Sequence, residues 1–117
     1  MRLLFTILVC LISVNLLSQN LSPEERDLYD AIMEYRASKG LSRIPLSSSL
    51  TFVAQTHCKD LVENQPDIGR CNGHSWSDNG KWSPCCYTPN HAKAECMWNK
   101  PSELTKYKGN GYEIACG

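Results

Sequence analysis

The segment from Cys71 to Cys116 constrains the fold of this chain most strongly. It shows neither a helical nor an alternating hydrophobic period, and Gly, Pro, Asn or Ser recurs every few residues. It also holds all but one of the cysteines that follow position 20. A long irregular stretch is uncommon in a compact domain unless it is functional or covalently held. We therefore expect disulfides to organise this segment.

The cysteine count supports that expectation. Apart from Cys10, which lies in an apolar leader, the chain has an even number of cysteines, and an even number in a short exported chain predicts a disulfide framework. A chain of 117 residues buries limited apolar area, so cross-links have a physical use. The candidates are Cys58, Cys71, Cys85, Cys86, Cys96 and Cys116. The sequence leaves their pairing open.

The first residues predict a secretory signal peptide. Arg2 precedes an apolar run over positions 3–17, and small or polar residues follow at 18–20. That run is shorter than the roughly 20 residues that a membrane-spanning helix needs. We expect residues 1–18 to be a removed signal and residues 19–117 to form one domain of a secreted protein without a membrane span.

Two helices are predicted before the cysteine-rich segment. Ser22 and Glu25 fit a capping box around Pro23, and Gly40 is suited to end the helix. The residues expected on the buried face of this helix are Leu28, Ala31, Ile32 and Tyr35. The serines at positions 47–49 offer caps for a second helix. Its apolar stripe consists of Leu50, Val53, Ala54, His57 and Leu61.

The remaining segments are predicted to be short or irregular. Residues 64–72 read as a surface loop, because they include Pro66 and Gly69. Residues 96–98 are compatible with a turn of helix or a strand, and Pro101 suits the start of a separate brief helix. His57 is expected to be a buried, hydrogen-bonded side chain beside a bridge at Cys58. Alternatively, it supports His74 from behind a binding site.

Four short segments, taken in order, resemble the first half of a CAP domain, the fold shared by cysteine-rich secretory proteins, venom antigen 5 proteins and plant pathogenesis-related proteins of class 1. They are Tyr35-Arg36-Ala37 with Gly40-Leu41 and Pro45-Leu46, then Leu50 to Leu61, then Gly73-His74-Ser75, and last Gly111-Tyr112-Glu113-Ile114. The resemblance implies an α+β fold. We expect a partial α-β-α sandwich in which two N-terminal helices precede a disulfide-stapled irregular region. The resemblance also implies a fragment that ends before most of the sheet.

The resemblance places His74 and Glu113 in one cavity. In the family this cavity is lined by two histidines and two glutamates, and no later residue of this chain matches the other two. Zinc usually takes three or four protein ligands. No cofactor is therefore required, and a divalent metal at His74 and Glu113 is a secondary expectation.

The implied function is a secreted binding or signalling module for a small apolar ligand, a metal or a protein partner, rather than an enzyme. One alternative is a hydrolase completed by further sequence, and another is a cysteine-rich structural or defence protein. Without Arg2, 11 basic side chains stand against 12 acidic ones. That balance gives no support for nucleic acid as a partner.

Other constellations compete with this interpretation. A zinc site is conceivable at Cys85, Cys86, His91 and Cys96, but adjacent cysteines in an exported chain are expected to pair as disulfides. The tryptophans at 76, 82 and 98 could form a ligand platform, although burial is their expected role. A serine-hydrolase triad is not expected, because neighbours such as His74 and Ser75 point to opposite faces of an extended chain.

Overall fold

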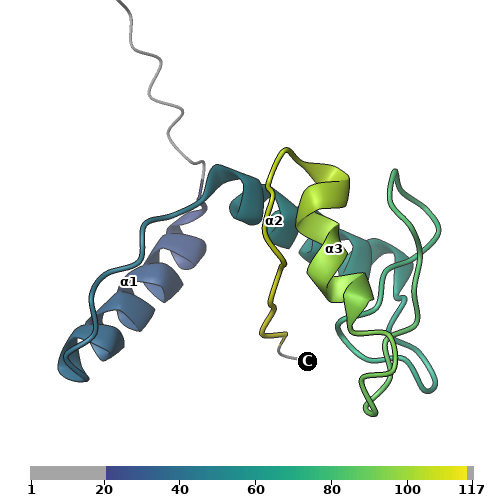
Figure 1. Ribbon diagram of the computed structural model, residues 1–117, viewed down its shortest axis with the longest axis horizontal. Helices are drawn as coiled ribbons and strands as arrows, with labels where there is room; N and C mark the ends of the chain where they lie inside the picture. The colour runs from purple at the N-terminus through teal and green to yellow at the C-terminus, as the bar shows by residue number, and fades with distance from the viewer. Residues whose placement is uncertain (1–20, 116–117) are drawn as a thin grey trace, which may run out of the picture.

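The computed structural model describes residues 21–115, which form three helices and no strand (Figure 1). The helices are α1 (Pro23–Ser38), α2 (Ser48–Asn64) and α3 (Glu95–Leu104). The two predicted N-terminal helices are confirmed, and no sheet is present within residues 21–115. The predicted signal peptide and Cys116 lie outside the described residues. None of the described helices is long and apolar enough to cross a bilayer.

Local chemistry sets both ends of α1 as predicted. The Ser22 hydroxyl accepts from the Glu25 N–H at 3.2 Å, and the Glu25 carboxylate accepts from the Ser22 N–H at 2.7 Å. These reciprocal bonds form the capping box. At the other end Gly40 adopts a φ of +69°, and the Leu41 N–H reaches the Arg36 carbonyl at 3.0 Å. This left-handed glycine satisfies carbonyls that the last turn leaves unpaired.

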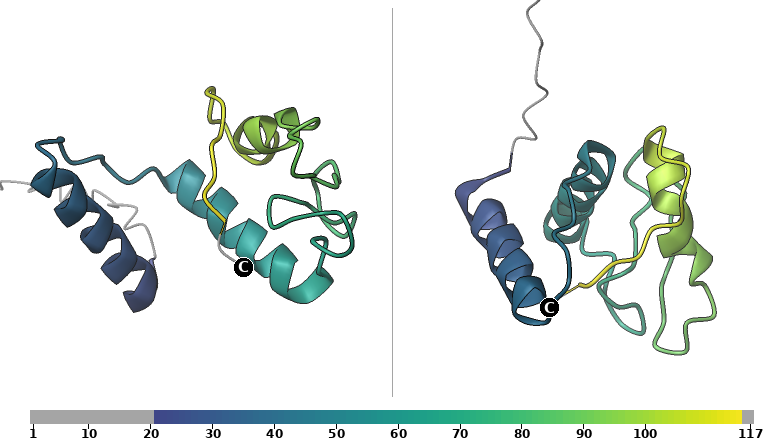
Figure 2. Two further views of the ribbon diagram at one scale, coloured as in Figure 1. Left: turned by 90° about the horizontal axis from the view of Figure 1, so that it is seen from below. Right: turned by 60° about the vertical axis from the view of Figure 1, so that its left-hand side comes forward.

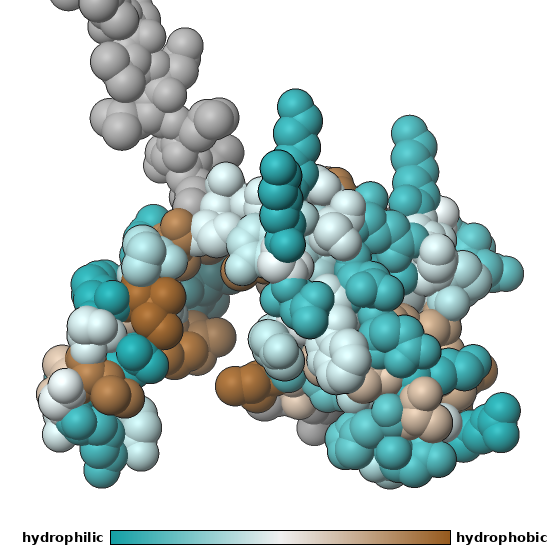
Figure 3. Space-filling view, in the orientation of Figure 1, coloured by the Kyte–Doolittle hydropathy of each residue, from teal (hydrophilic) through white to brown (hydrophobic). Residues whose placement is uncertain are grey.

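The predicted buried face of α1 is wrong. Leu28, Ile32 and Tyr35 are 64%, 47% and 65% exposed, and apolar side chains are visible along α1 in Figure 3. The connector that follows α1 covers another side of the helix, where the Ile44 N–H donates to the Met33 sulfur at 3.2 Å. Two residues of this stripe, Leu28 and Ile32, instead line one wall of an open groove of about 230 Å³ between α1 and α2. A helical period shows that a helix has an apolar face, and only the tertiary structure determines what covers it.

Helix α2 is capped by Ser47, whose hydroxyl accepts from the Leu50 N–H at 3.3 Å. It ends where Gln65 turns left-handed, with a φ of 49°. Its fully buried side chains are His57 and Asp60, so the inward side of α2 is partly polar. Asp60 accepts from the Ser77 N–H at 2.8 Å, which ties the irregular segment to the helix. A buried carboxylate is tolerated here because its oxygens are hydrogen-bonded.

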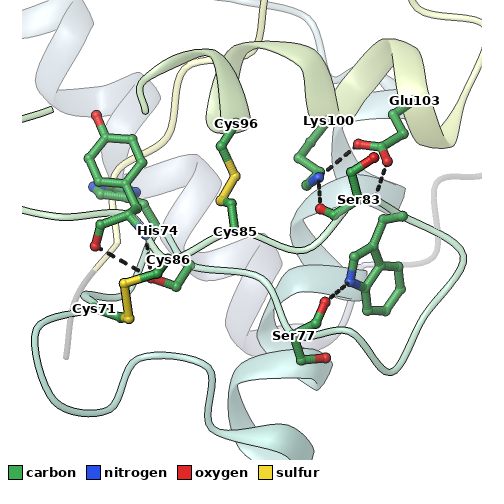
Figure 4. The surroundings of a disulfide bond; sticks show 12 residues. Cys71, His74, Ser77, Ser83, Cys85, Cys86, Cys96, Lys100 and Glu103 are labelled. Atoms are coloured by element: carbon green, nitrogen blue, oxygen red, sulfur yellow. Dashed lines mark hydrogen bonds and ion pairs between the residues drawn. A yellow bond between two sulfur atoms is a disulfide. The ribbon is translucent and has the colours of Figure 1, made fainter. Parts of the chain in front are cut away.

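Disulfides hold the irregular segment together, as predicted. Cys71 bonds to Cys86 and Cys85 bonds to Cys96 (Figure 4). A single antiparallel bridge between Trp76 and Cys85 adds two backbone hydrogen bonds of 2.9 and 3.0 Å. Because Cys85, Cys86 and Cys96 are all oxidised, the zinc alternative at these sulfurs is wrong. Cys58 is exposed and forms no disulfide with another described cysteine.

Helix α3 is one continuous element rather than the two short pieces that the sequence suggested. Pro101 lies inside it and is buried. The chain at Gly111 packs on the Pro101 ring so closely that a side-chain carbon at Gly111 would lie 2.6 Å from that ring. Lys100 is also buried, with its ammonium 2.7 Å from the Glu103 carboxylate and bonded to the Ser83 carbonyl (Figure 4). Packing of this kind outweighs the helix-breaking tendency of one proline.

The bridge between Cys71 and Cys86 closes a loop of 15 residues, so its removal should destabilise the fold measurably. We expect the double variant Cys71→Ser/Cys86→Ser to lose about 2–4 kcal/mol of unfolding free energy. The matched control Cys58→Ser, at an exposed position, should lose about 0.5 kcal/mol or less. Denaturant or thermal unfolding measures both. Equal losses in the two proteins would contradict the stapling role.

Candidate functional site

His74 and Glu113, the two residues predicted to share a cavity, are in direct contact. The His74 Nδ1 lies 2.8 Å from the Glu113 Oε2. His74 is positioned by a turn in which its N–H donates to the Asn72 side-chain oxygen at 3.1 Å. Glu113 lies on the extended segment of residues 109–115, which we call the strap; in Figures 1 and 2 it returns from α3 past α2. Thus two residues 39 positions apart are brought together so that an imidazole meets a carboxylate.

The cluster has a third member, His57 on α2. Its Nδ1 contacts the second Glu113 oxygen, Oε1, and its Nε2 lies 2.9 Å from the Ser75 carbonyl oxygen. The side chain is only 2% exposed, as expected for a histidine on the apolar stripe. We call His57, His74 and Glu113 the clamp. The sequence suggested that His57 could support His74. In the structure the two histidines are connected through Glu113, and the helical period of the sequence gives no indication of that connection.

Aromatic rings form the inner wall behind the clamp. The Trp76 ring stacks on the His57 ring with centroids 4.3 Å apart and an interplanar angle of 9°. Trp76 is 3% exposed, and the Lys100 ammonium lies 5.4 Å from its ring centroid. Burial is thus the role of Trp76, whereas Trp98 is 37% exposed and does not follow the expected pattern. The three tryptophans do not form one exposed platform.

The clamp shifts the acidity of two of its members. Burial alone lowers the pKa of His57, but the hydrogen bond and charge of Glu113, followed by the Ser75 carbonyl, outweigh burial and raise that pKa above its usual value. Burial raises the pKa of Glu113, yet its bonds to His57 and His74 dominate and leave that pKa below its usual value. Both shifts favour the ionised pair of an imidazolium and a carboxylate.

A small cavity adjoins the clamp between α2, α3 and the strap. Its volume is about 70 Å³. Its apolar walls are formed by Leu50, Val53, Ala54, Trp76, Met97, Pro101 and Tyr112. Glu113 and Lys100 also line it, so an ionised group of each sign borders an otherwise apolar space. A cavity of this size accommodates a few waters or a short aliphatic group.

The site offers limited metal chemistry. Among residues 21–115 there is no group of three or more His, Cys, Asp or Glu side chains placed to hold a metal ion. His74 and Glu113 already bond to each other, and two ligands are fewer than zinc usually takes. The expectation of a divalent metal at this pair therefore stays a prediction. Ser75 is not poised as a nucleophile, because it is fully buried and its hydroxyl accepts from the Tyr87 N–H at 2.9 Å.

Comparisons with known proteins add no relative. No protein-family model matches the chain, and neither a curated protein nor a solved structure is significantly similar to it.

Replacing the Glu113 carboxylate should weaken the clamp in a pH-dependent way. In Glu113→Gln, an amide N–H₂ takes the place of one acceptor oxygen and faces an imidazole N–H. We expect a loss of about 1.5–3 kcal/mol in unfolding free energy at pH 6. Because the folded pKa of Glu113 is lowered, its contribution is present above the usual value of 4.5 and is lost as the pH falls through the folded pKa. The gap between wild type and variant should therefore close in acid.

Chemical denaturation at several pH values measures this gap. Glu63→Gln is the matched control, since Glu63 sits on the exposed side of α2 with only a long 3.9 Å pairing to Lys59. That control should stay within about 0.5 kcal/mol of wild type at every pH. A Glu113→Gln variant that behaves like the control would show that the clamp does not stabilise the fold.

Proposed function

We propose that this chain is part of an exported binding module of the CAP type, and that the cavity beside Glu113 holds a small ligand with an apolar body. The observation that carries this proposal is the contact between His74 and Glu113. The resemblance drawn from the sequence implied a shared cavity for these two residues. Export follows from the proposed signal peptide and agrees with the two disulfides, which persist in oxidising compartments.

The cavity supports a ligand of defined character. Ligand sites are typically apolar with a few convergent polar groups, and this cavity has apolar walls with the Glu113 carboxylate at one border. Each Glu113 oxygen receives one imidazole contact and keeps lone-pair capacity for a further donor. A short alkyl group that ends in a hydroxyl or an amine fits both features. At about 70 Å³ the cavity is far smaller than a site for a drug-sized molecule.

A second candidate function is hydrolysis, and one observation favours it. A carboxylate that bonds the Nδ1 of an imidazole fixes the ring and its tautomer, as in enzymes that use histidine as a general base. Ser75, the sequence neighbour of His74, is not available as its nucleophile, since the Ser75 hydroxyl is engaged with the backbone of Tyr87. Binding without chemistry is therefore the better supported function.

Short alcohols provide the test of the binding site. We expect 1-butanol to shift the NMR signals of Ala54 and Met97 in wild type, because both residues line the cavity. Ala54→Leu should abolish these shifts by filling the space. His74→Ala should weaken them severalfold, because Glu113 loses one of its two imidazole partners. The matched control His91→Ala removes a histidine whose contact is the Tyr87 hydroxyl, and it should bind like wild type.

Shifts spread evenly over the surface, or unchanged in Ala54→Leu, would refute the site. Turnover of an ester added in place of the alcohol, lost in His74→Ala and kept in His91→Ala, would instead favour the hydrolase.

A further inference from the structure

His57 lies between two oxygen acceptors. On one side its Nδ1 meets the Glu113 carboxylate, and on the other its Nε2 lies 2.9 Å from the Ser75 carbonyl oxygen. A carbonyl and an ionised carboxylate accept hydrogen bonds and do not donate them. A neutral imidazole has only one N–H, so it leaves one of these contacts as a repulsion between lone pairs. With a proton on each nitrogen, both contacts become hydrogen bonds.

The charged groups around His57 also favour a positive ring. Asp60 lies on the same helix, one turn further along, and Glu113 approaches from the strap. Trp76 presents its face to the His57 ring at 4.3 Å, which attracts a cation. Lys100 of α3 is a cation near the same Trp76 ring, 5.4 Å from its centroid, and the Glu103 carboxylate bonds to it at 2.7 Å. His74 reaches His57 only through Glu113.

The strap depends on this contact for its position. The side chains on either side of Glu113 are largely exposed, with Tyr112 79% and Ile114 95% exposed. Within residues 21–115, hydrogen bonds hold it at two places: the Gly111 N–H donates to the Trp98 carbonyl at 2.8 Å, and the Glu113 carboxylate enters the clamp. Glu113 is the anchor with charge. Whatever fixes the Glu113 carboxylate therefore also fixes the strap beside the cavity.

We propose that His57 is held as a buried imidazolium and acts as a positioning residue, which fixes Glu113 and through it His74 and the strap of residues 109–115. The ring makes no contact with the proposed ligand; it sets the geometry of the groups that border the cavity. The part of this inference that concerns the cavity rests on the proposed function. The charge of His57 and its effect on the position of the strap do not depend on the proposed function.

The inference has a definite pH direction. Contacts that require the extra proton raise the folded pKa of His57 above its value of 6.5 in the unfolded chain. Their stabilisation is complete below 6.5 and is lost as the pH rises through the folded pKa. The strap is consequently held most firmly at mildly acidic pH, where Glu113 is also ionised, and it loosens in alkali. Between 6.5 and the folded pKa, the equilibrium constant for opening rises by up to about tenfold per pH unit, and above the folded pKa it levels off.

Two measurements on the wild-type chain test the proposal without any variant. Nitrogen NMR distinguishes an imidazolium, whose two ring nitrogens resonate close together, from a neutral ring, whose nitrogens differ widely. At pH 6.5 we expect the imidazolium pattern for His57, and its titration midpoint should lie above 6.5. Hydrogen exchange at the Gly111 amide, corrected for intrinsic rates, should show protection that falls as the pH rises above 6.5 and then levels off. A neutral His57 ring at pH 6.5 would overturn the proposal.

The variant His57→Gln separates positioning from simple packing. Glutamine preserves a donor of similar reach but does not titrate, so the Gly111 protection should become independent of pH between 6 and 9. His91→Gln, the matched control at an exposed histidine, should keep the wild-type pH profile. A pH profile unchanged by His57→Gln would refute the positioning role even if the variant is less stable. Failure of butanol to bind would refute the proposed ligand site and leave these results standing.

Discussion

Two disulfides that meet at adjacent residues are the constraint on which the rest of this structure depends. Cys85 and Cys86 join the start of α3, through Cys96, to the start of the irregular segment, through Cys71. The segment between α2 and α3 is thus tied at a single dipeptide. This matters because the large apolar side chains that are buried, among the residues described, are few: Met33, Trp76 and Tyr87, beside the ring of Pro101. So small a core does not offset the entropy of ordering an irregular chain, and the cross-links reduce that entropy.

Hydrogen-bonded polar groups organise the remainder of the interior. His57, Asp60, Ser75 and Lys100 are all buried, and each has a partner on another segment. Buried polar groups contribute little net stability, but they are costly when unpaired. They therefore discriminate strongly between the correct arrangement of the segments and any arrangement that leaves them without partners. The buried polar groups of this chain therefore specify how its segments are arranged more than they add to the free energy of unfolding.

The sequence predicted the features whose causes are local. The capping box at Ser22 and the left-handed Gly40 depend on neighbours within a few residues, and both were correct. The exposure of the apolar stripe of α1 and the continuation of α3 past Pro101 depend on the segments that pack against these helices. No local sequence pattern encodes that packing. A family resemblance placed His74 and Glu113 in one cavity; the structure brings their side chains into contact, and the shared cavity stays a prediction. That Glu113 also binds His57 follows only from the fold, because these residues are 56 positions apart.

The clamp connects the candidate site to the fold, and this connection limits which ligands the site can bind. The carboxylate that borders the cavity is also the charged anchor of the strap, and its partner His57 stacks on Trp76, one of the few buried apolar groups. A ligand that displaced Glu113 would therefore bind more weakly, because breaking the clamp and the stacking would offset part of its binding free energy. A ligand that leaves Glu113 in place costs nothing of this kind. The geometry thus favours a small guest that adds a donor to a preformed carboxylate over one that displaces it.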